Sequence, residues 1–248
     1  MFTTSIHVSK AETVKHVDLY YPENLDAKGR QVPLTSELQN VFANIERQSG
    51  LKFTIVILPW KRAQIEVARG RGIIYGLSKS IERLEIYRFS APVLTLPVWA
   101  ISYGPENANI AELMDLKGKI VATSVGVTHG VEFERARKNF FVVEEDYLPF
   151  QERLKKLITK RSDVIFVPFS FQLKREEIEY RFHRILVDGF NDPELNGRRF
   201  NVSLNPIFLD SIHFASSKRN LQDVIDRIDI ALARGSKDGS LLKLLNNY

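Results

Sequence analysis

A short glycine-bounded segment is the first place in this sequence where residue types and spacing could serve chemistry. Residues 126–130 read GVTHG, and the pattern after Gly130 predicts a helix. Backbone N–H groups at a helix N-terminus attract anions, so this turn could hold an anionic group with the Thr128 hydroxyl as a further donor. His129, inside the turn, could donate a hydrogen bond into a cleft. The alternative is a plain turn in which Thr128 caps the helix.

Other residue types argue against most catalytic and metal sites. The five histidines show no paired metal-ligand spacing. The absence of cysteine excludes a disulfide scaffold, a thiol nucleophile and an iron–sulfur cluster. The sequence contains no G-x-S-x-G, phosphate-loop or H-E-x-x-H motif. We therefore expect neither a metal nor a cofactor.

The charge balance favours an anionic small partner over nucleic acid. The 248 residues include 35 basic and 30 acidic side chains, a net charge of +5. Both signs are interleaved, and the densest stretch, KREE at 174–177, cancels itself. A nucleic-acid-binding protein more often has a one-sided basic face, so we expect no nucleic-acid partner.

No membrane span is predicted, and the compartment stays open at this point. The weakly polar run at 91–101 holds two prolines and has about half the length of the roughly 20 residues that a span needs. The first residues lack the basic and apolar regions of a secretory signal. The protein is then either cytosolic or an exported protein whose signal has been removed.

Apolar periodicity predicts alternating strands and helices in the first part of the chain. Strands are expected at 17–21, 53–58 and 73–77, with helices at 36–49 and 61–69 between them. In the first helix, Ser36 and Gln39 suggest a capping box and Gly50 a stop. This βαβαβ order predicts a parallel sheet.

A second series of elements follows a proline-marked stretch at 92–97, near which a linker is expected. The expected strands are 98–102, 120–123, 140–143 and 164–167, with helices after Gly130 and around Leu154. Residues 191–205 are polar and predict a loop or a return crossing. A long apolar stripe over 221–232 and a short segment at 241–245 predict terminal helices. The chain is thus an α/β protein with two sheet-centred halves.

Four short motifs, in order, resemble one protein family. They are LPWKRA at 58–63, GLSKSIER at 76–83 followed by FSAP at 89–92, DLKGK at 115–119 running into the GVTHG turn, and KDGSL at 237–241. Together they are similar to the bacterial extracellular solute-binding proteins of family 3, the polar-amino-acid-binding type.

The resemblance implies a two-lobed type II periplasmic-binding-protein fold with two hinge crossings. One lobe would comprise residues 1–95 and 211–248, and the other residues 96–210. The crossings would lie at 94–97 and 206–210. A solute would bind in the cleft, which closes by hinge motion.

The resemblance also implies a set of ligand-binding residues. Arg83 matches the family arginine that holds a ligand carboxylate, a role that suits the planar guanidinium. Trp60 matches an aromatic wall of the cleft. The remaining implied positions are Gly76, Ser78 and Tyr20 in one lobe and Val127, Thr128 and His129 in the other.

One departure from the family pattern bears on the ligand. The position of the acid that holds the ammonium group of an amino acid is Pro168 here. An unpaired ammonium in a closed cleft is unfavourable, so an α-amino acid would need another acid, such as Asp163.

The sequence therefore predicts a periplasmic solute-binding protein rather than an enzyme. It would be a monomer that captures a small carboxylate-bearing solute for the membrane permease of an ABC transporter. Two alternatives remain: a dehydratase-like enzyme on the same fold, and a sensor or docking module that binds no small solute tightly.

Overall fold

The computed structural model describes residues 14–26, 28–190 and 199–245, which form a mixed α/β fold around a ten-stranded sheet. The strands are β1 (Lys15–Pro22), β2 (Leu51–Leu58), β3 (Ile73–Leu77), β4 (Tyr87–Phe89), β5 (Leu94–Tyr103), β6 (Ile120–Ser124), β7 (Val142–Asp146), β8 (Val164–Pro168), β9 (Phe200–Val202) and β10 (Phe208–Ser217). The α-helices are α1 (Ser36–Ser49), α2 (Trp60–Ala68), α3 (Ile81–Ile86), α4 (Val131–Asn139), α5 (Phe150–Ile158), α6 (Arg175–Phe190), α7 (Gln222–Lys237) and α8 (Ser240–Leu245).

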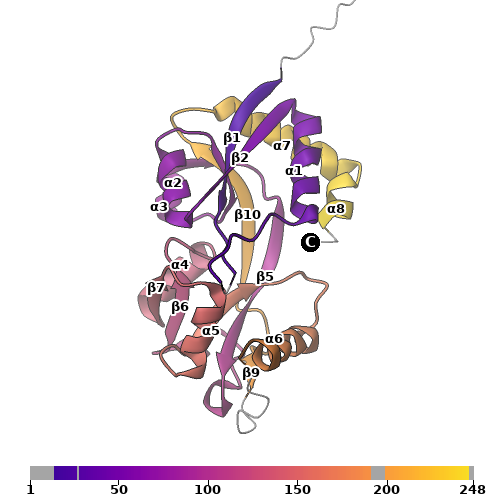
Figure 1. Cartoon of the computed structure of the whole chain (residues 1–248). Helices are drawn as coiled ribbons and strands as arrows, with labels where there is room; N and C mark the ends of the chain where they lie inside the picture. The colour runs from indigo at the N-terminus through magenta and orange to yellow at the C-terminus, as the bar shows by residue number, and fades with distance from the viewer. Residues whose placement is uncertain (1–13, 27, 191–198, 246–248) are drawn as a thin grey trace, which may run out of the picture.

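Two long strands join an upper and a lower half of the molecule (Figure 1). The strand order is β2-β1-β3-β10-β5-β8-β6-β7, with β4 beside β10 and β9 beside β5. Strand β10 pairs with β5 through residues 208–212 and with β3 and β4 through residues 213–217. Strand β5 continues beyond β10 to pair with β8 and β9. The predicted two-lobed α/β fold with two crossings is confirmed.

The first half consists of β1–β4, α1–α3, α7 and α8. The predicted apolar face of α1 is buried, with Leu38, Val41 and Ile45 each at most 1% exposed. It packs with the stripe of α7 around Phe214. The predicted capping box is wrong, because Thr35 is the N-cap and its hydroxyl accepts from the Leu38 amide at 3.3 Å.

The second half consists of β6–β9 and α4–α6, and it has two hydrophobic clusters of its own. One surrounds Trp99 and Phe182 beneath α5 and α6, and the other surrounds Phe133 and Phe208 beneath α4. Hydrophobic clusters therefore lie on both sides of the crossing strands. The domain boundaries given above stay a prediction.

Several predicted elements are shifted in the structure. The linker expected near residues 93–98 lies in an extended strand, β5, which starts at Leu94 and crosses between the halves. The strand expected at 140–143 is β7, which starts at Val142. Phe200–Val202 is strand β9 within the predicted loop, while residues 191–198 lie outside the described part. Helix α6 was not predicted.

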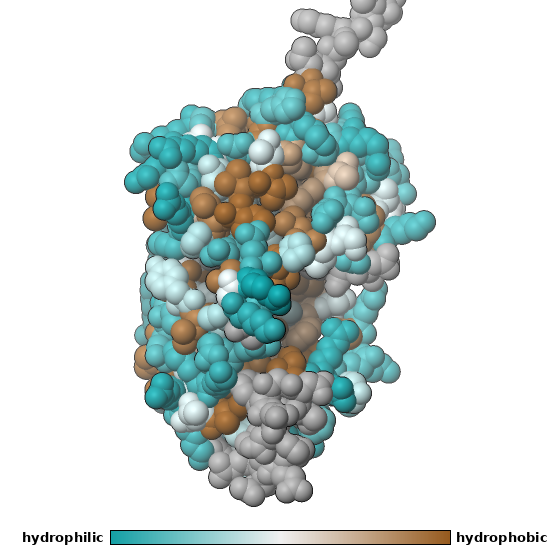
Figure 2. All heavy atoms as spheres, in the orientation of Figure 1, coloured by the Kyte–Doolittle hydropathy of each residue, from teal (hydrophilic) through white to brown (hydrophobic). Residues whose placement is uncertain are grey.

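The surface of the first half shows hydrophobic side chains near β1 and β2 in Figure 2. Strand β2 lies at the edge of the sheet and leaves Ile55 38% exposed. In the part of the chain that the structure describes, every helix is too short or too polar to span a bilayer.

Candidate functional site

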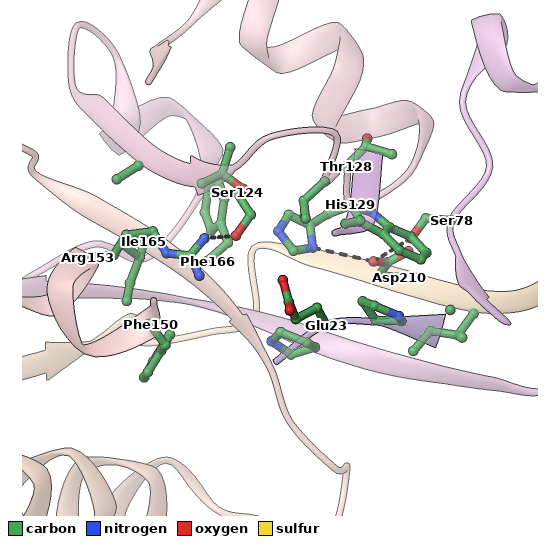
Figure 3. Close-up of a pocket in the computed structure, with 18 of the residues that line it drawn as sticks. Glu23, Ser78, Ser124, Thr128, His129, Phe150, Arg153, Ile165, Phe166 and Asp210 are labelled. Atoms are coloured by element: carbon green, nitrogen blue, oxygen red, sulfur yellow. Dashed lines mark hydrogen bonds and ion pairs between the residues drawn. The ribbon is translucent and has the colours of Figure 1, made fainter. Parts of the chain in front are cut away.

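A cavity of about 330 Å³ lies between the two halves. The first half contributes residues that follow its strands, among them Glu23 after β1 and Ser78 after β3. The second half contributes Ser124 at the end of β6, the 126–130 turn, and side chains of α5 and β8. Both polar and apolar side chains face this space (Figure 3).

Arg83 is buried at this cavity, and its guanidinium is bound by protein groups. Helix α3 begins at the N-cap Ser80, whose hydroxyl accepts from the Arg83 amide at 3.2 Å. The guanidinium donates to the Ser78 carbonyl at 2.8 Å and to the Gly126 carbonyl at 2.5 Å. Burial lowers the pKa of Arg83 to about 10, which leaves it charged at neutral pH. Its role as a carboxylate anchor stays a prediction.

The Gly126 carbonyl receives three hydrogen bonds from the first half. Besides Arg83, Trp60 donates through Nε1 at 3.1 Å and Gln64 through Nε2 at 2.9 Å. Gly126 has φ +79°, a left-handed conformation that glycine adopts without strain. The three side chains, which we call the Gly126 clasp, bind one half of the protein to the other.

Asp210, on the crossing strand β10, is a buried carboxylate at the cavity. It is 6% exposed, and its Oδ2 accepts from the Ser78 hydroxyl at 2.9 Å. His129 Nδ1 lies 3.4 Å from the same oxygen. Asp210 Oδ1 and His129 Nδ1 have no hydrogen-bond partner among the described residues. Because Ser78 bonds to the carboxylate and not to an imidazole, the three do not have the order of a serine–histidine–aspartate triad.

Arg153 reaches the cavity from the other half. Helix α5 begins after Pro149, and Phe150 and Arg153, three residues apart, share the face that lines the cavity. The Arg153 guanidinium donates to the Ser124 hydroxyl, as Figure 3 shows. Burial lowers the pKa of Arg153, while Asp146 opposes that shift.

Most of the predicted site residues line this cavity. Those that do are Arg83, Trp60, Gly76, Ser78, Val127, Thr128 and His129. Tyr20 does not: it packs with Ala63 and Val67 beneath α2. The N-cap of α4 is Gly130, not Thr128, and no side chain caps this helix. Asp163 accepts from the Ile120 amide at 2.8 Å and does not line the cavity.

Sequence reasoning missed Asp210, Arg153 and Glu23 as cavity residues. The only signal in the sequence for Asp210 is its place at the end of the crossing predicted at 206–210. Within the described ranges, no group of three or more histidine, aspartate or glutamate side chains could hold a metal ion.

The fold is that of the extracellular binding proteins of amino-acid ABC transporters. A putative L-cystine ABC transporter from Listeria monocytogenes is 19% identical with a TM-score of 0.66, covering 95% of this chain and 96% of its own. An ancestral arginine-binding protein bound to arginine is 18% identical with a TM-score of 0.66, covering 94% and 97%.

The probable amino-acid ABC transporter extracellular-binding protein ytmK from Bacillus subtilis is 19% identical with a TM-score of 0.61, covering 94% and 96%. The structural neighbours are thus the type of protein that the sequence motifs resemble. No protein-family model and no curated protein matches the sequence.

Proposed function

We propose that this chain is a periplasmic solute-binding protein that captures a small carboxylate-bearing solute and delivers it to the permease of an ABC transporter. The observation that carries the proposal is the cavity between the halves, into which both halves place charged side chains. Two arginines, Arg83 and Arg153, reach it, and neither forms an ion pair with a described carboxylate. A buried cation without a counterion favours an anionic ligand.

Closure would follow from the two crossing strands. A solute that contacts both halves stabilises their closed arrangement by its differential affinity for it. The Gly126 clasp already joins the halves, so the solute would add to contacts that exist without it. The structural neighbours include an arginine-binding protein and a putative L-cystine ABC transporter, which supports amino acids or related carboxylates as the class to test first.

Thermal unfolding against a library of small solutes tests the proposal. The protein is first unfolded, dialysed and refolded to remove any solute acquired during expression. At a concentration of one hundred times Kd, a ligand adds about 2.7 kcal/mol to the unfolding free energy. Each kcal/mol raises the Tm of a chain of this size by about 2–4 °C.

The library contains carboxylates, matched amides and matched amines. A rise in Tm with carboxylates and not with the amides supports the proposal. If no solute raises the Tm, the protein is not a small-solute-binding protein, and a docking role takes its place. Conversion of a bound solute, followed by NMR, would instead support the enzyme alternative.

A further inference from the structure

The surroundings of Arg153 leave room for an anion. Its guanidinium has five N–H donors. Among the described residues, Ser124 is its hydrogen-bond partner, and no carboxylate pairs with it. Asp146, the acid whose charge acts on Arg153, is already engaged: its carboxylate accepts from Lys156 Nζ at 2.8 Å and from the Leu148 amide at 3.0 Å.

Arg83 differs in this respect. It is 9% exposed, and its two terminal nitrogens already donate to Ser78, Gly126 and Gln64. A solute carboxylate would have to displace the Gly126 carbonyl from Arg83 and so break a contact between the halves. A carboxylate at Arg153 displaces no such contact.

At the other side of the cavity lies a carboxylate that lacks a full set of partners. Figure 3 shows Asp210 with Ser78 and His129 on one side of the view and Arg153 with Ser124 on the other. Asp210 Oδ1 is buried without a hydrogen-bond donor within the described residues. A buried carboxylate oxygen is stabilised by a charged donor, and an ammonium or guanidinium group on a ligand would supply one.

Part of the cavity lining is apolar. Phe150, Ile165, Phe166 and Ile212 line the cavity together with the charged residues. These apolar side chains favour contact with a methylene chain of the ligand. A cavity of about 330 Å³ has the space of roughly ten water molecules.

We infer that Arg153, and not Arg83, receives the acidic group of the solute, while Asp210 receives a basic group at the solute's other end. The solute is then a dipolar molecule whose charges are separated by a short apolar chain, not one that carries both on a single carbon. This inference rests on the proposed function, because it describes the ligand of the same cavity.

A series of ω-amino acids tests the spacing. Calorimetric titration of the refolded wild type would compare glycine, 4-aminobutyrate, 5-aminovalerate and 6-aminohexanoate. We expect affinity to rise with chain length to an optimum among the longer members, at least tenfold tighter than glycine. Hexanoate and hexylamine, which each lack one charge, should bind at least tenfold more weakly than 6-aminohexanoate. Equal or tighter binding of glycine or glutarate would overturn the inference.

Substitutions then test the two residues with the best member of the series. Arg153→Met should weaken binding by about tenfold to a hundredfold, the loss expected for a charge-assisted hydrogen bond. Asp210→Asn should weaken it similarly. Arg135→Met, at an exposed arginine on α4, is the matched control and should bind as wild type does.

The outcomes separate this inference from the proposed function. If wild type binds a library carboxylate but no ω-amino acid, only the dipolar assignment fails. Binding by Arg153→Met within twofold of wild type also refutes it. Should Asp210→Asn not fold, the comparison of 6-aminohexanoate with hexanoate on wild type still decides the basic end. A wild type that binds nothing in either set refutes the proposed function itself.

Discussion

Two arginines reach the same cleft from opposite halves, and their surroundings differ. Arg83 donates to two backbone carbonyls and a glutamine, one of those carbonyls belonging to the facing half. Among the residues that the structure describes, Arg153 donates only to the Ser124 hydroxyl, which belongs to its own half. In both, burial lowers the guanidinium pKa. The arginine on one wall of the cleft thus holds the two halves together, whereas the arginine on the other wall keeps N–H donors that a ligand could use.

The contrast has an energetic consequence. A buried polar group that has its partners stabilises the fold, and its removal leaves those partners unsatisfied. A buried charge without a counterion is instead a cost that a ligand can offset. We therefore expect that replacing Arg83 lowers the stability of the ligand-free protein, whereas replacing Arg153 does not.

The largest expected effect comes from replacing the two arginines separately. Arg83→Met should lower the free energy of unfolding by about 1.5–3 kcal/mol, because the Ser78 and Gly126 carbonyls each lose a charged donor. Arg153→Met should change it by less than about 0.5 kcal/mol or raise it, because a charge without a counterion leaves a partly buried site. Urea denaturation without ligand measures both. Equal losses of unfolding free energy in the two variants would contradict the difference proposed between Arg83 and Arg153.

A smaller effect is expected from Gly126, the acceptor of the clasp. Gly126→Ala should cost about 1–2 kcal/mol from left-handed backbone strain, and more because the new Cβ would lie 3.0 Å from Gln64 Nε2. Gly118→Ala is the matched control: φ is +75°, and nothing lies within 4 Å of the Cβ position. The excess loss at Gly126 measures crowding within the clasp. If both variants lose the same amount, the clasp tolerates a methyl group.

Two buried histidines differ in the same way, because only one of them forms a hydrogen bond through Nδ1 among the described residues. His213, 3% exposed, has Nδ1 2.8 Å from the Ser90 carbonyl, while His129 Nδ1 makes no hydrogen bond among the described residues and lies 3.4 Å from Asp210 Oδ2. Burial lowers the pKa of His213, and the nearby charge of Lys79 adds to that shift while Asp210 opposes it. The folded state therefore resists protonation of His213 more than the unfolded state does.

This shift predicts that acid destabilises the protein through His213. Between the lowered folded pKa and the unfolded value of about 6.5, the unfolded state binds more protons, so stability falls as pH falls. One proton gives at most about 1.4 kcal/mol per pH unit. Unfolding free energies of wild type and His213→Asn from pH 7.5 to 5 should converge as pH falls. His16→Asn, at an exposed position on β1, should keep the wild-type slope.

The sequence allowed the fold to be predicted because local patterns and global packing agree. The helix period of α1 and the glycine at its end are both local signals, and both are realised. Arg83, Trp60 and Ser78 could be placed at the cavity because they lie in continuous motifs after strands of one sheet.

Asp210 and Arg153 could not be placed by the same means. Asp210 bonds to Ser78, 132 residues earlier in the chain, and only the pairing of β10 with β3 and β5 brings the two together. Arg153 lies in a charged helix sequence, QERLKK, where an arginine ordinarily faces solvent. Long-range strand pairing and the direction of a helix face are tertiary facts that one sequence does not specify.

The smallest expected effect tests whether the three donors of the Gly126 clasp stabilise the protein independently of one another. Trp60→Phe removes the Nε1 donor, but the Gly126 carbonyl keeps Gln64 and Arg83, so the loss should be only about 0.5–1 kcal/mol. Trp99→Phe is the control, because Trp99 Nε1 is buried without a partner among the described residues and its removal should cost less.

In an Arg83→Met background, Trp60→Phe should cost more than in wild type, since fewer donors then remain for the carbonyl. A double-mutant cycle measures this coupling, and strict additivity would mean that the three donors act independently rather than as one contact.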